Sequence, residues 1–340
     1  MSKQIRVLVV DDSLVFREVI ARGISSDPAI QVVAKATDPF EARDYILQLH
    51  PDLMICDVEM PKMNGIEFIR RLLPQYSLPV LVVSTVTHAV FDAMNAGAVD
   101  FVPKPNANSP EDVRRFIQDL IAKIKIAVGA KIPADSQPQE RITDTAKPVS
   151  DTSMIAVGAS TGGTEAFFQM LQALPASMPG IVVVQHIPPV FSNMFAQRLN
   201  QSTPFSVKEA QTGDYIEPGK VLIAPGDMHM RVKKDGVKYR VECYAGEKIS
   251  GHRPSVDVLF ESVAREAGRR AVGVILTGMG YDGAKGLLAM RRKGARTIGQ
   301  DEASSVVYGM PKAAFNIGAV EKQASLAQIP QLLHRWTTGQ

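Results

Sequence analysis

The run Gly-Ala-Ser-Thr-Gly-Gly at 158–163 is the segment with the most direct chemical meaning. It reads G-x-S-x-G and lies between an expected strand, Met154–Val157, and an expected helix, Thr164–Leu174. Such a turn presents a serine at the edge of a sheet, and the helix behind it offers N–H groups to an oxyanion. The alternative is an anion-binding loop, but the spacing fits neither common nucleotide-binding motif. The motif therefore predicts Ser160 as a nucleophile.

A nucleophilic serine needs a base, and His186 is the best placed of the six histidines. It follows the expected strand Ile181–Gln185, one strand–helix unit after Ser160, so both residues belong at the same carboxyl edge of a parallel sheet. His229 is the competing base. His252 lies in a polar Gly-His-Arg-Pro turn and is expected to contact substrate.

The base needs an acid that orients it, and Asp282 follows the continuous apolar strand expected at Ala271–Leu276. Asp282 could instead cap the helix expected at Ala284–Lys293, and one loop can serve both purposes. The chain order serine, histidine, aspartate differs from the orders of the α/β-hydrolases, chymotrypsin and subtilisin. The sequence thus predicts a triad on a fold other than the standard α/β-hydrolase.

A second group of polar residues follows the ends of successive expected strands in the first third of the chain: Asp11, Asp12, Asp57, Ser84 and Lys104. The carboxyl ends of parallel strands meet at one edge, so these side chains should share one crevice. Neighbouring carboxylates favour Mg²⁺, and a lysine suits a phosphoryl oxygen. A single polar residue at a strand end could simply cap the helix that follows, with Asp12 or Ser13 as the candidates. The whole set favours a site. The Lys104–Pro105 bond is a candidate cis peptide.

Alternating strands and helices must position both groups, and they predict two doubly wound α/β domains. The first, 1–126, suits a flavodoxin-like parallel sheet, and the second, 151–340, a Rossmann-like sheet with an antiparallel hairpin at Met230–Tyr244. Residues 127–150 are rich in Pro, Gln, Ser and Thr and predict a linker. The strands expected in the first domain are Ile5–Val10, Ile30–Ala36, Asp52–Cys56, Pro79–Ser84 and Val99–Val102.

Composition excludes several other classes of protein. A length of 340 residues with 45% hydrophobic and 21% charged residues allows two cores and argues against disorder. The net charge of +3 gives no electrostatic case for nucleic acid. Two cysteines, no CxxC pair, no apolar leader and no run of about 18 apolar residues predict a cytoplasmic protein without membrane insertion.

The first domain resembles the receiver domain of two-component response regulators, through VLVVDDS at its start, MICDVEMP around Asp57, and Lys104-Pro105. The resemblance implies that Asp57 accepts a phosphoryl group from a sensor histidine kinase. It also implies a Mg²⁺ site and a set of switch residues. Asp11, Asp12, Asp57 and the Glu59 carbonyl would surround the ion, and the switch residues would be Ser84, Phe101 and Lys104.

The whole chain resembles the chemotaxis response-regulator protein-glutamate methylesterases of the CheB type. The matching segments of the second domain are VGASTGG, QHIPP, APGDMHM, GHRPSVDVLF and LTGMGYDGA. The resemblance implies a metal-free esterase site in which Ser160 is the nucleophile, His186 the base and Asp282 its orienter. Thr161 and Met279 would line the site and are candidates for the oxyanion hole.

The expected activity is demethylation of glutamate γ-methyl esters on methyl-accepting chemoreceptors, regulated by phosphorylation and releasing methanol. Deamidation of receptor glutamines would use the same triad, because both carbonyls suit one oxyanion hole. The alternative is a non-catalytic response regulator whose second domain binds a partner. A DNA-binding version would need a basic recognition helix, and the basic end of 284–293 is better explained by the helix dipole.

Overall fold

The computed structural model describes residues 3–61, 63–85, 87–105, 109–131, 142 and 153–338. Its internal contacts divide the chain into two units, Met1–Ala134 and Asp135–Gln340. Most of the predicted linker, 127–150, lies outside the described residues, so its character stays a prediction. No helix in the described ranges combines the length and the apolar character needed to cross a bilayer.

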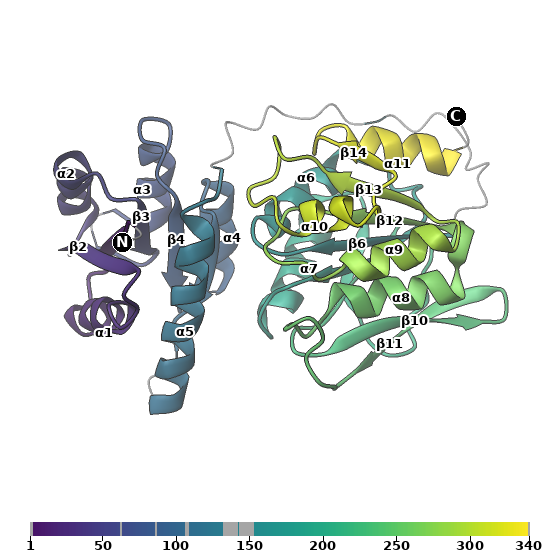
Figure 1. Cartoon of the computed structure of the whole chain (residues 1–340), viewed down its shortest axis with the longest axis horizontal. Coiled ribbons are helices and arrows are strands. Elements are labelled where there is room, and N and C mark those ends of the chain that lie inside the picture. Colours follow the sequence, from purple (N-terminus) through teal and green to yellow (C-terminus); the bar gives the residue numbers. More distant parts are fainter. Residues whose placement is uncertain are drawn as a thin grey trace. The chain divides into compact units, whose positions relative to one another are not determined.

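The first unit is a five-stranded parallel sheet in the order β2-β1-β3-β4-β5, which is the flavodoxin-like order (Figure 1). Helix α1 packs against α5, and α3 packs against α4. Ser13 caps α1 by accepting from the Phe16 amide, so Asp12 is not needed for that role. The bounds are β1 Ile5–Val10, α1 Leu14–Ile24, β2 Ile30–Ala36, α2 Pro39–Leu49, β3 Leu53–Asp57, α3 Gly65–Leu72, β4 Val80–Ser84, α4 Thr87–Asn95, β5 Asp100–Pro103 and α5 Pro110–Ala127.

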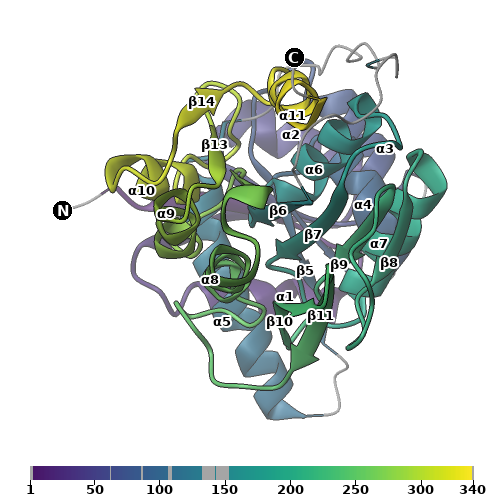
Figure 2. The ribbon, with the colours of Figure 1, turned by 90° about the vertical axis from the view of Figure 1, so that its right-hand side faces the viewer.

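The second unit contains a seven-stranded parallel sheet in the order β14-β13-β12-β6-β7-β9-β8 (Figure 2). Helices α8, α9 and α10 lie on one face of this sheet, and α6, α7 and α11 lie on the other. The bounds are β6 Met154–Ala159, α6 Gly163–Ala173, β7 Gly180–Gln185, α7 Phe191–Ser202, β8 Ser206–Glu209, β9 Lys220–Ile223, α8 Val256–Glu266, β12 Ala271–Ile275, α9 Ala284–Arg292, β13 Arg296–Gln300, α10 Met310–Asn316, β14 Lys322–Ala324 and α11 Ile329–Thr338.

The predicted antiparallel excursion is present as a separate two-stranded sheet, β10 His229–Asp235 and β11 Lys238–Tyr244. Asp235 pairs with Lys238, so the two-residue turn is Gly236-Val237, one position later than the Asp-Gly pair suggested. Gly236 has φ +59, a left-handed conformation that glycine adopts without a steric cost. The glycine of that pair is therefore the first turn residue.

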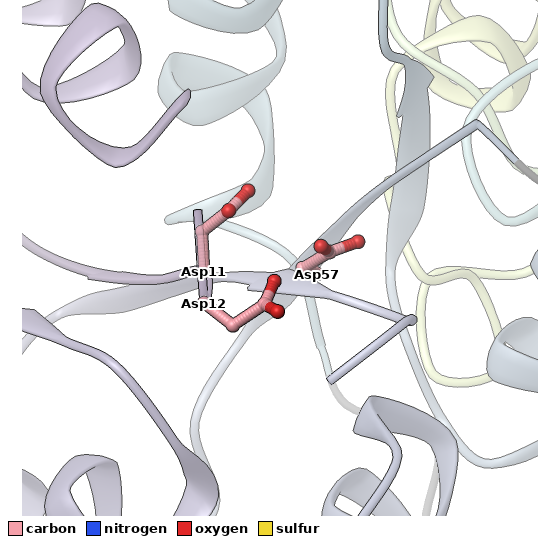
Figure 3. A group of neighbouring side chains, drawn as sticks. All are labelled: Asp11, Asp12 and Asp57. Carbon is pink, nitrogen blue, oxygen red and sulfur yellow. The ribbon is translucent and has the colours of Figure 1, made fainter. Parts of the chain in front are cut away.

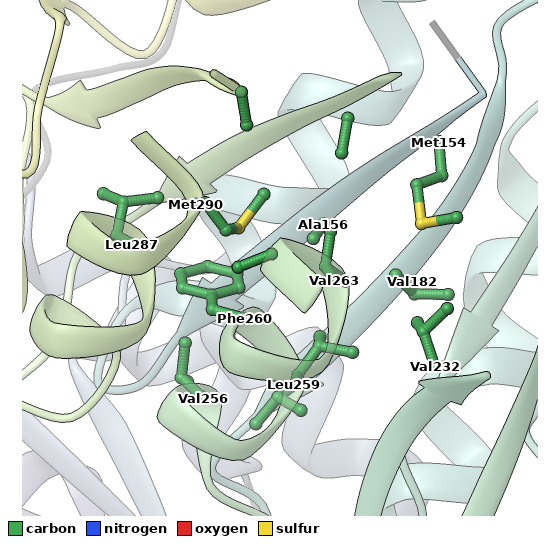
Figure 4. Close-up of a cluster of buried hydrophobic side chains, with 14 of the residues drawn as sticks. Met154, Ala156, Val182, Val232, Val256, Leu259, Phe260, Val263, Leu287 and Met290 are labelled. Atoms are coloured by element: carbon green, nitrogen blue, oxygen red, sulfur yellow. The ribbon is translucent and has the colours of Figure 1, made fainter. Parts of the chain in front are cut away.

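Helix α8 connects the hairpin to the main sheet through a continuous apolar core. Phe260 and Leu259 of α8 are fully buried, between Val232 of β10 on one side and Leu287 of α9 on the other (Figure 4). Burying a side chain of this size stabilises the fold by about 1.5–3 kcal/mol. This packing fixes the N-terminus of α8 against the carboxyl edge of the sheet, where it meets Asp282.

Candidate functional sites

The sequence-predicted acidic group assembles at the carboxyl edge of the first sheet. Asp11 and Asp12 follow β1, and Asp57 ends β3, so carboxylate oxygens of all three lie within 4.8 Å of one another (Figure 3). Asp11 and Asp57 are buried and Asp12 is exposed. Three carboxylates in one cluster are a donor set suited to a hard divalent cation.

Lys104 joins this group from the end of β5. Its Nζ lies 2.6 Å from Asp57 Oδ2 and 2.8 Å from Asp11 Oδ2, and its side chain is 7% exposed. Burial raises the pKa of Asp57, although the hydrogen bond and charge of Lys104 oppose that rise. The Lys104–Pro105 bond is not cis: among the described residues the cis peptide is Arg253–Pro254.

The remaining receiver residues also lie close to this edge. Ser84 ends β4 and is buried. The Glu59 amide donates to Asp57 Oδ1 at 3.3 Å, and the Glu59 carboxylate accepts from the Thr85 hydroxyl. Phe101 is buried in β5 and packs edge-on against Phe91, with ring centroids 6.5 Å apart.

The second site lies where the strand order of the large sheet reverses. The chain enters the sheet at β6, winds outward through β7, and later returns to β12 on the other side of β6. In such sheets the crevice at the carboxyl end of the reversal point is the expected ligand site. Ser160 follows β6 there, directly beside the end of β7, because Ala159 is paired with Gln185.

Two hydrogen bonds from neighbouring segments hold the turn that carries Ser160. The Ser160 amide donates to the Thr277 carbonyl at 3.0 Å, and the Ser160 carbonyl accepts from Gln185 Nε2 at 2.8 Å. Gly162 has φ +76, and a Cβ there would lie 2.7 Å from Val306 Cβ. The G-x-S-x-G motif indicates the role of Gly162, but it does not indicate that Gln185 supports the turn. The only sequence feature that points to Gln185 is its position directly before His186.

His186 and Asp282 form the predicted pair. His186 Nε2 lies 2.8 Å from Asp282 Oδ2, and the Asp282 side chain is fully buried. His186 Nδ1 is also buried and has no hydrogen-bond partner among the described residues. A carboxylate only accepts, so Nε2 carries the proton and Nδ1 presents its lone pair.

Asp282 binds the N-terminus of a helix, but not of the one the sequence suggested: this helix is α8, whose N-cap residue is Ser255. The N-cap of α9 is Gly283, whereas Asp282 accepts from the first residues of α8: the Val256 amide at 2.8 Å, the Asp257 amide at 3.0 Å and the Ser255 hydroxyl at 2.8 Å. Burial alone would raise the pKa of Asp282, but His186 and the α8 amides together lower it. The aspartate is therefore held as a carboxylate.

The competing base, His229, is committed to structure. It is buried, its Nδ1 accepts from the Ser255 amide at 3.2 Å, and its Nε2 lies 2.8 Å from the Glu247 carbonyl. The Ser160 turn instead lies beside His186, whose amide donates to the Ala159 carbonyl at 3.1 Å. The geometry favours His186 as the base.

The two oxyanion candidates flank the serine turn. Thr161 is buried, and its carbonyl accepts from the Thr277 hydroxyl at 3.0 Å. Met279 is 47% exposed in the loop after β12, and its amide donates to no acceptor among the described residues. An amide without an internal acceptor can donate to a developing oxyanion.

The folds and the two sites define a class of protein: a response regulator whose output domain is an α/β unit with the residues of a serine hydrolase. Comparison with known proteins gives the family. Residues 155–333 match the CheB methylesterase family, and residues 7–117 match the response regulator receiver domain. This chain belongs to the CheB methylesterase family.

Curated relatives match along nearly their whole length. A protein-glutamate methylesterase/protein-glutamine glutaminase of Syntrophomonas wolfei is 56% identical over 98% of both chains. One of Salmonella typhi is 45% identical over 100% of this chain and 99% of its own. The Thermotoga maritima CheB methylesterase catalytic domain is 36% identical, with a TM-score of 0.52, and covers 54% of this chain and 97% of its own.

Proposed function

We propose that this chain hydrolyses glutamate γ-methyl esters, and the side-chain amides of glutamine, on methyl-accepting chemoreceptors, and that phosphorylation of Asp57 regulates it. The observation that carries the proposal is the His186–Asp282 hydrogen bond beside the Ser160 turn, within the segment that matches the methylesterase family. Relatives named for both reactions support the two substrate classes. A partner-binding output domain without catalysis would need none of this arrangement.

The proposed reaction uses side chains and backbone amides of this chain together with water. Ser160 Oγ attacks the ester or amide carbonyl while its proton passes to His186 Nδ1, because Nε2 is held by Asp282. The tetrahedral oxyanion accepts from nearby amides, with those of Met279 and Thr161 as candidates. His186 returns the proton to the leaving methanol or ammonia. Water then attacks the acyl-enzyme by the same route and frees the glutamate.

The test is methanol release from membranes that contain methylated receptor. We expect Ser160→Ala to abolish release while its unfolding free energy stays within about 1 kcal/mol of the wild type, because a half-exposed hydroxyl is removed. Ser202→Ala, an exposed serine at the end of α7, is the matched control and should keep full activity. Release by folded Ser160→Ala at the wild-type rate would discard the assignment.

We further propose that the receiver binds Mg²⁺ through Asp11, Asp12, Asp57 and the Glu59 carbonyl. The three clustered carboxylates are hard oxygen donors and fit that ion. When bound, it would neutralise charge on the incoming phosphoryl group. Asp57 would accept this group from a sensor histidine kinase, and Lys104, 2.6 Å away, and Ser84 would contact it.

Regulation is tested with the full chain and a small phosphodonor plus Mg²⁺. We expect the phosphodonor to raise the rate of methanol release in the wild type and in the control Asp44→Asn, an exposed aspartate of α2. It should have no effect on Asp57→Asn, which keeps the size of the side chain but cannot be phosphorylated. An equal response of Asp57→Asn would contradict the proposal.

We place the protein in the cytoplasm, where Cys56 and Cys243, both free, would stay reduced.

A further inference from the structure

The ring of His252 lies flat against the ring of the base. Its centroid is 3.7 Å from that of His186, and the two planes are inclined by only 9°. His186 therefore has one face covered by His252, while its Nε2 is held at its edge by Asp282. The single hydrogen bond to Asp282 would still allow the His186 ring to rotate about the axis of that bond. A ring stacked on its face opposes this tilting.

The turn that carries His252 is anchored at several points. Ile249 and His252 exchange backbone hydrogen bonds of 3.0 and 2.9 Å across Ser250 and Gly251, both of which have positive φ. The Ser250 hydroxyl is 3.1 Å from Asp257 Oδ2 of α8. Arg253 donates to Asp227 Oδ1 from two nitrogens, at 2.9 and 2.6 Å, and also to the Gly246 carbonyl.

The same segment, 249–257, also holds the acid. Ser255, Val256 and Asp257 provide the three donors that orient Asp282. Buried His229 connects the two ends of the loop between β11 and α8: its Nδ1 accepts from the Ser255 amide, and its Nε2 bonds to the Glu247 carbonyl. A displacement of this segment would thus disturb His186 and Asp282 together.

We infer that His252 is a positioning residue, whose stacked ring holds the His186 imidazole in the plane that directs Nε2 to Asp282 and Nδ1 to Ser160. The inference rests on the proposed function, because it assumes that His186 is the base. A neutral neighbour also tolerates the imidazolium that forms when His186 takes the Ser160 proton, whereas a charged one would repel it.

The surroundings keep His252 neutral. Burial lowers its pKa to about 4, and the charges of His186 and Lys248 act in the same direction, while Asp282 opposes them. These three are the titratable groups that act on His252, and at neutral pH its ring carries no charge. At neutral pH the stack on His186 therefore joins the base to a neutral ring.

The experiment compares His252→Phe, which keeps a flat ring, with His252→Leu, which fills space without one, and with His252→Ala. The matched control is Ile249→Ala, a half-exposed side chain of the same turn. We expect kcat for methanol release to fall about 10–100-fold in the Leu and Ala variants, with KM within about 2-fold, because a misplaced base costs about that much. His252→Phe and Ile249→Ala should stay within about 3-fold of the wild type.

Labelling of Ser160 by a fluorophosphonate separates this inference from the proposed function. Failure of the wild type to label at Ser160 would discard the proposed function. If the wild type labels, we expect slower labelling of His252→Leu and His252→Ala, and labelling of His252→Phe close to the wild-type rate. Wild-type rates of labelling and methanol release in folded His252→Leu, or a loss in His252→Phe as large as in His252→Leu, would overturn the stacking role.

Discussion

Replacing Asp282 by asparagine should lower kcat by a much larger factor than it lowers the folding equilibrium constant. One of the four hydrogen bonds to its carboxylate fixes the tautomer of His186, whereas the other three hold the N-terminus of α8. Oδ2 accepts from His186 Nε2 and the Val256 amide, each at 2.8 Å. Oδ1 accepts from the Ser255 hydroxyl and the Asp257 amide. Asparagine has the same shape but offers one acceptor oxygen and one donor group.

Each orientation of the asparagine amide has a defined cost. With its NH₂ group toward His186, Nε2 must become the acceptor, so Nδ1 holds the proton and cannot take one from Ser160; the wrong tautomer costs about 10⁴-fold in kcat. With its NH₂ group toward Asp257, the histidine tautomer survives, but the imidazolium loses its counter-charge. Either orientation leaves one buried backbone amide without an acceptor, at about 1–3 kcal/mol of unfolding free energy.

The measurement pairs methanol release with urea unfolding of Asp282→Asn. We expect kcat to fall about 10³–10⁴-fold and the unfolding free energy to fall by about 1–3 kcal/mol. Asp214→Asn is the matched control, since Asp214 also accepts from a backbone amide and a side chain but lies in the loop between β8 and β9. A folded Asp282→Asn with kcat within 10-fold of the wild type would refute the assignment of the tautomer to Asp282.

Two further outcomes follow from the same contacts. In urea titrations, the difference in unfolding free energy between the wild type and Asp282→Asn should narrow as the pH falls below about 3.8. A carboxyl whose pKa is lowered on folding stabilises the protein at a pH above its ordinary pKa, and this stabilisation is lost when the carboxyl is protonated. An unchanged difference at low pH would contradict this. Gly278→Ala should lower kcat about 10-fold or more, because a Cβ there would lie 2.7 Å from Ser160 Cβ and 2.5 Å from Met310 Sδ. Adding Met310→Ala should not restore methanol release, because the contact with Ser160 remains.

The central strands of both sheets could be predicted from the sequence because they are continuous apolar runs. The predicted bounds of β1 and β2 agree with the structure, those of β4 differ by one residue at one end, and those of β3 and β5 are displaced by one residue at both ends. The edge strands β8 and β14 were not predicted. They have only four and three residues, and each buries only one side chain, so no apolar pattern marks them.

The gathering of site residues could be predicted for the same reason. The rule that parallel strands share one carboxyl edge was enough to bring Asp11, Asp57 and Lys104 together, and to place His186 beside the Ser160 turn. The contacts between loops could not be predicted this way. The stack of His252 on His186, and the binding of Asp282 to the N-terminus of α8, join segments distant in sequence, and their geometry depends on how α8 packs against the sheet.

The unusual order of serine, histidine and aspartate follows from the topology of the sheet rather than from the chemistry. Neighbouring strands lie about 4.8 Å apart, so β7 and β12, which flank β6, are separated by about 10 Å. Ser160 follows the central strand β6, and His186 follows β7 on one side of it. The chain returns only later to β12 on the other side of β6. The loop after β12 then carries Asp282 back to His186, where the fixed N-terminus of α8 holds it. A different winding of the strands would change the order and leave the roles the same.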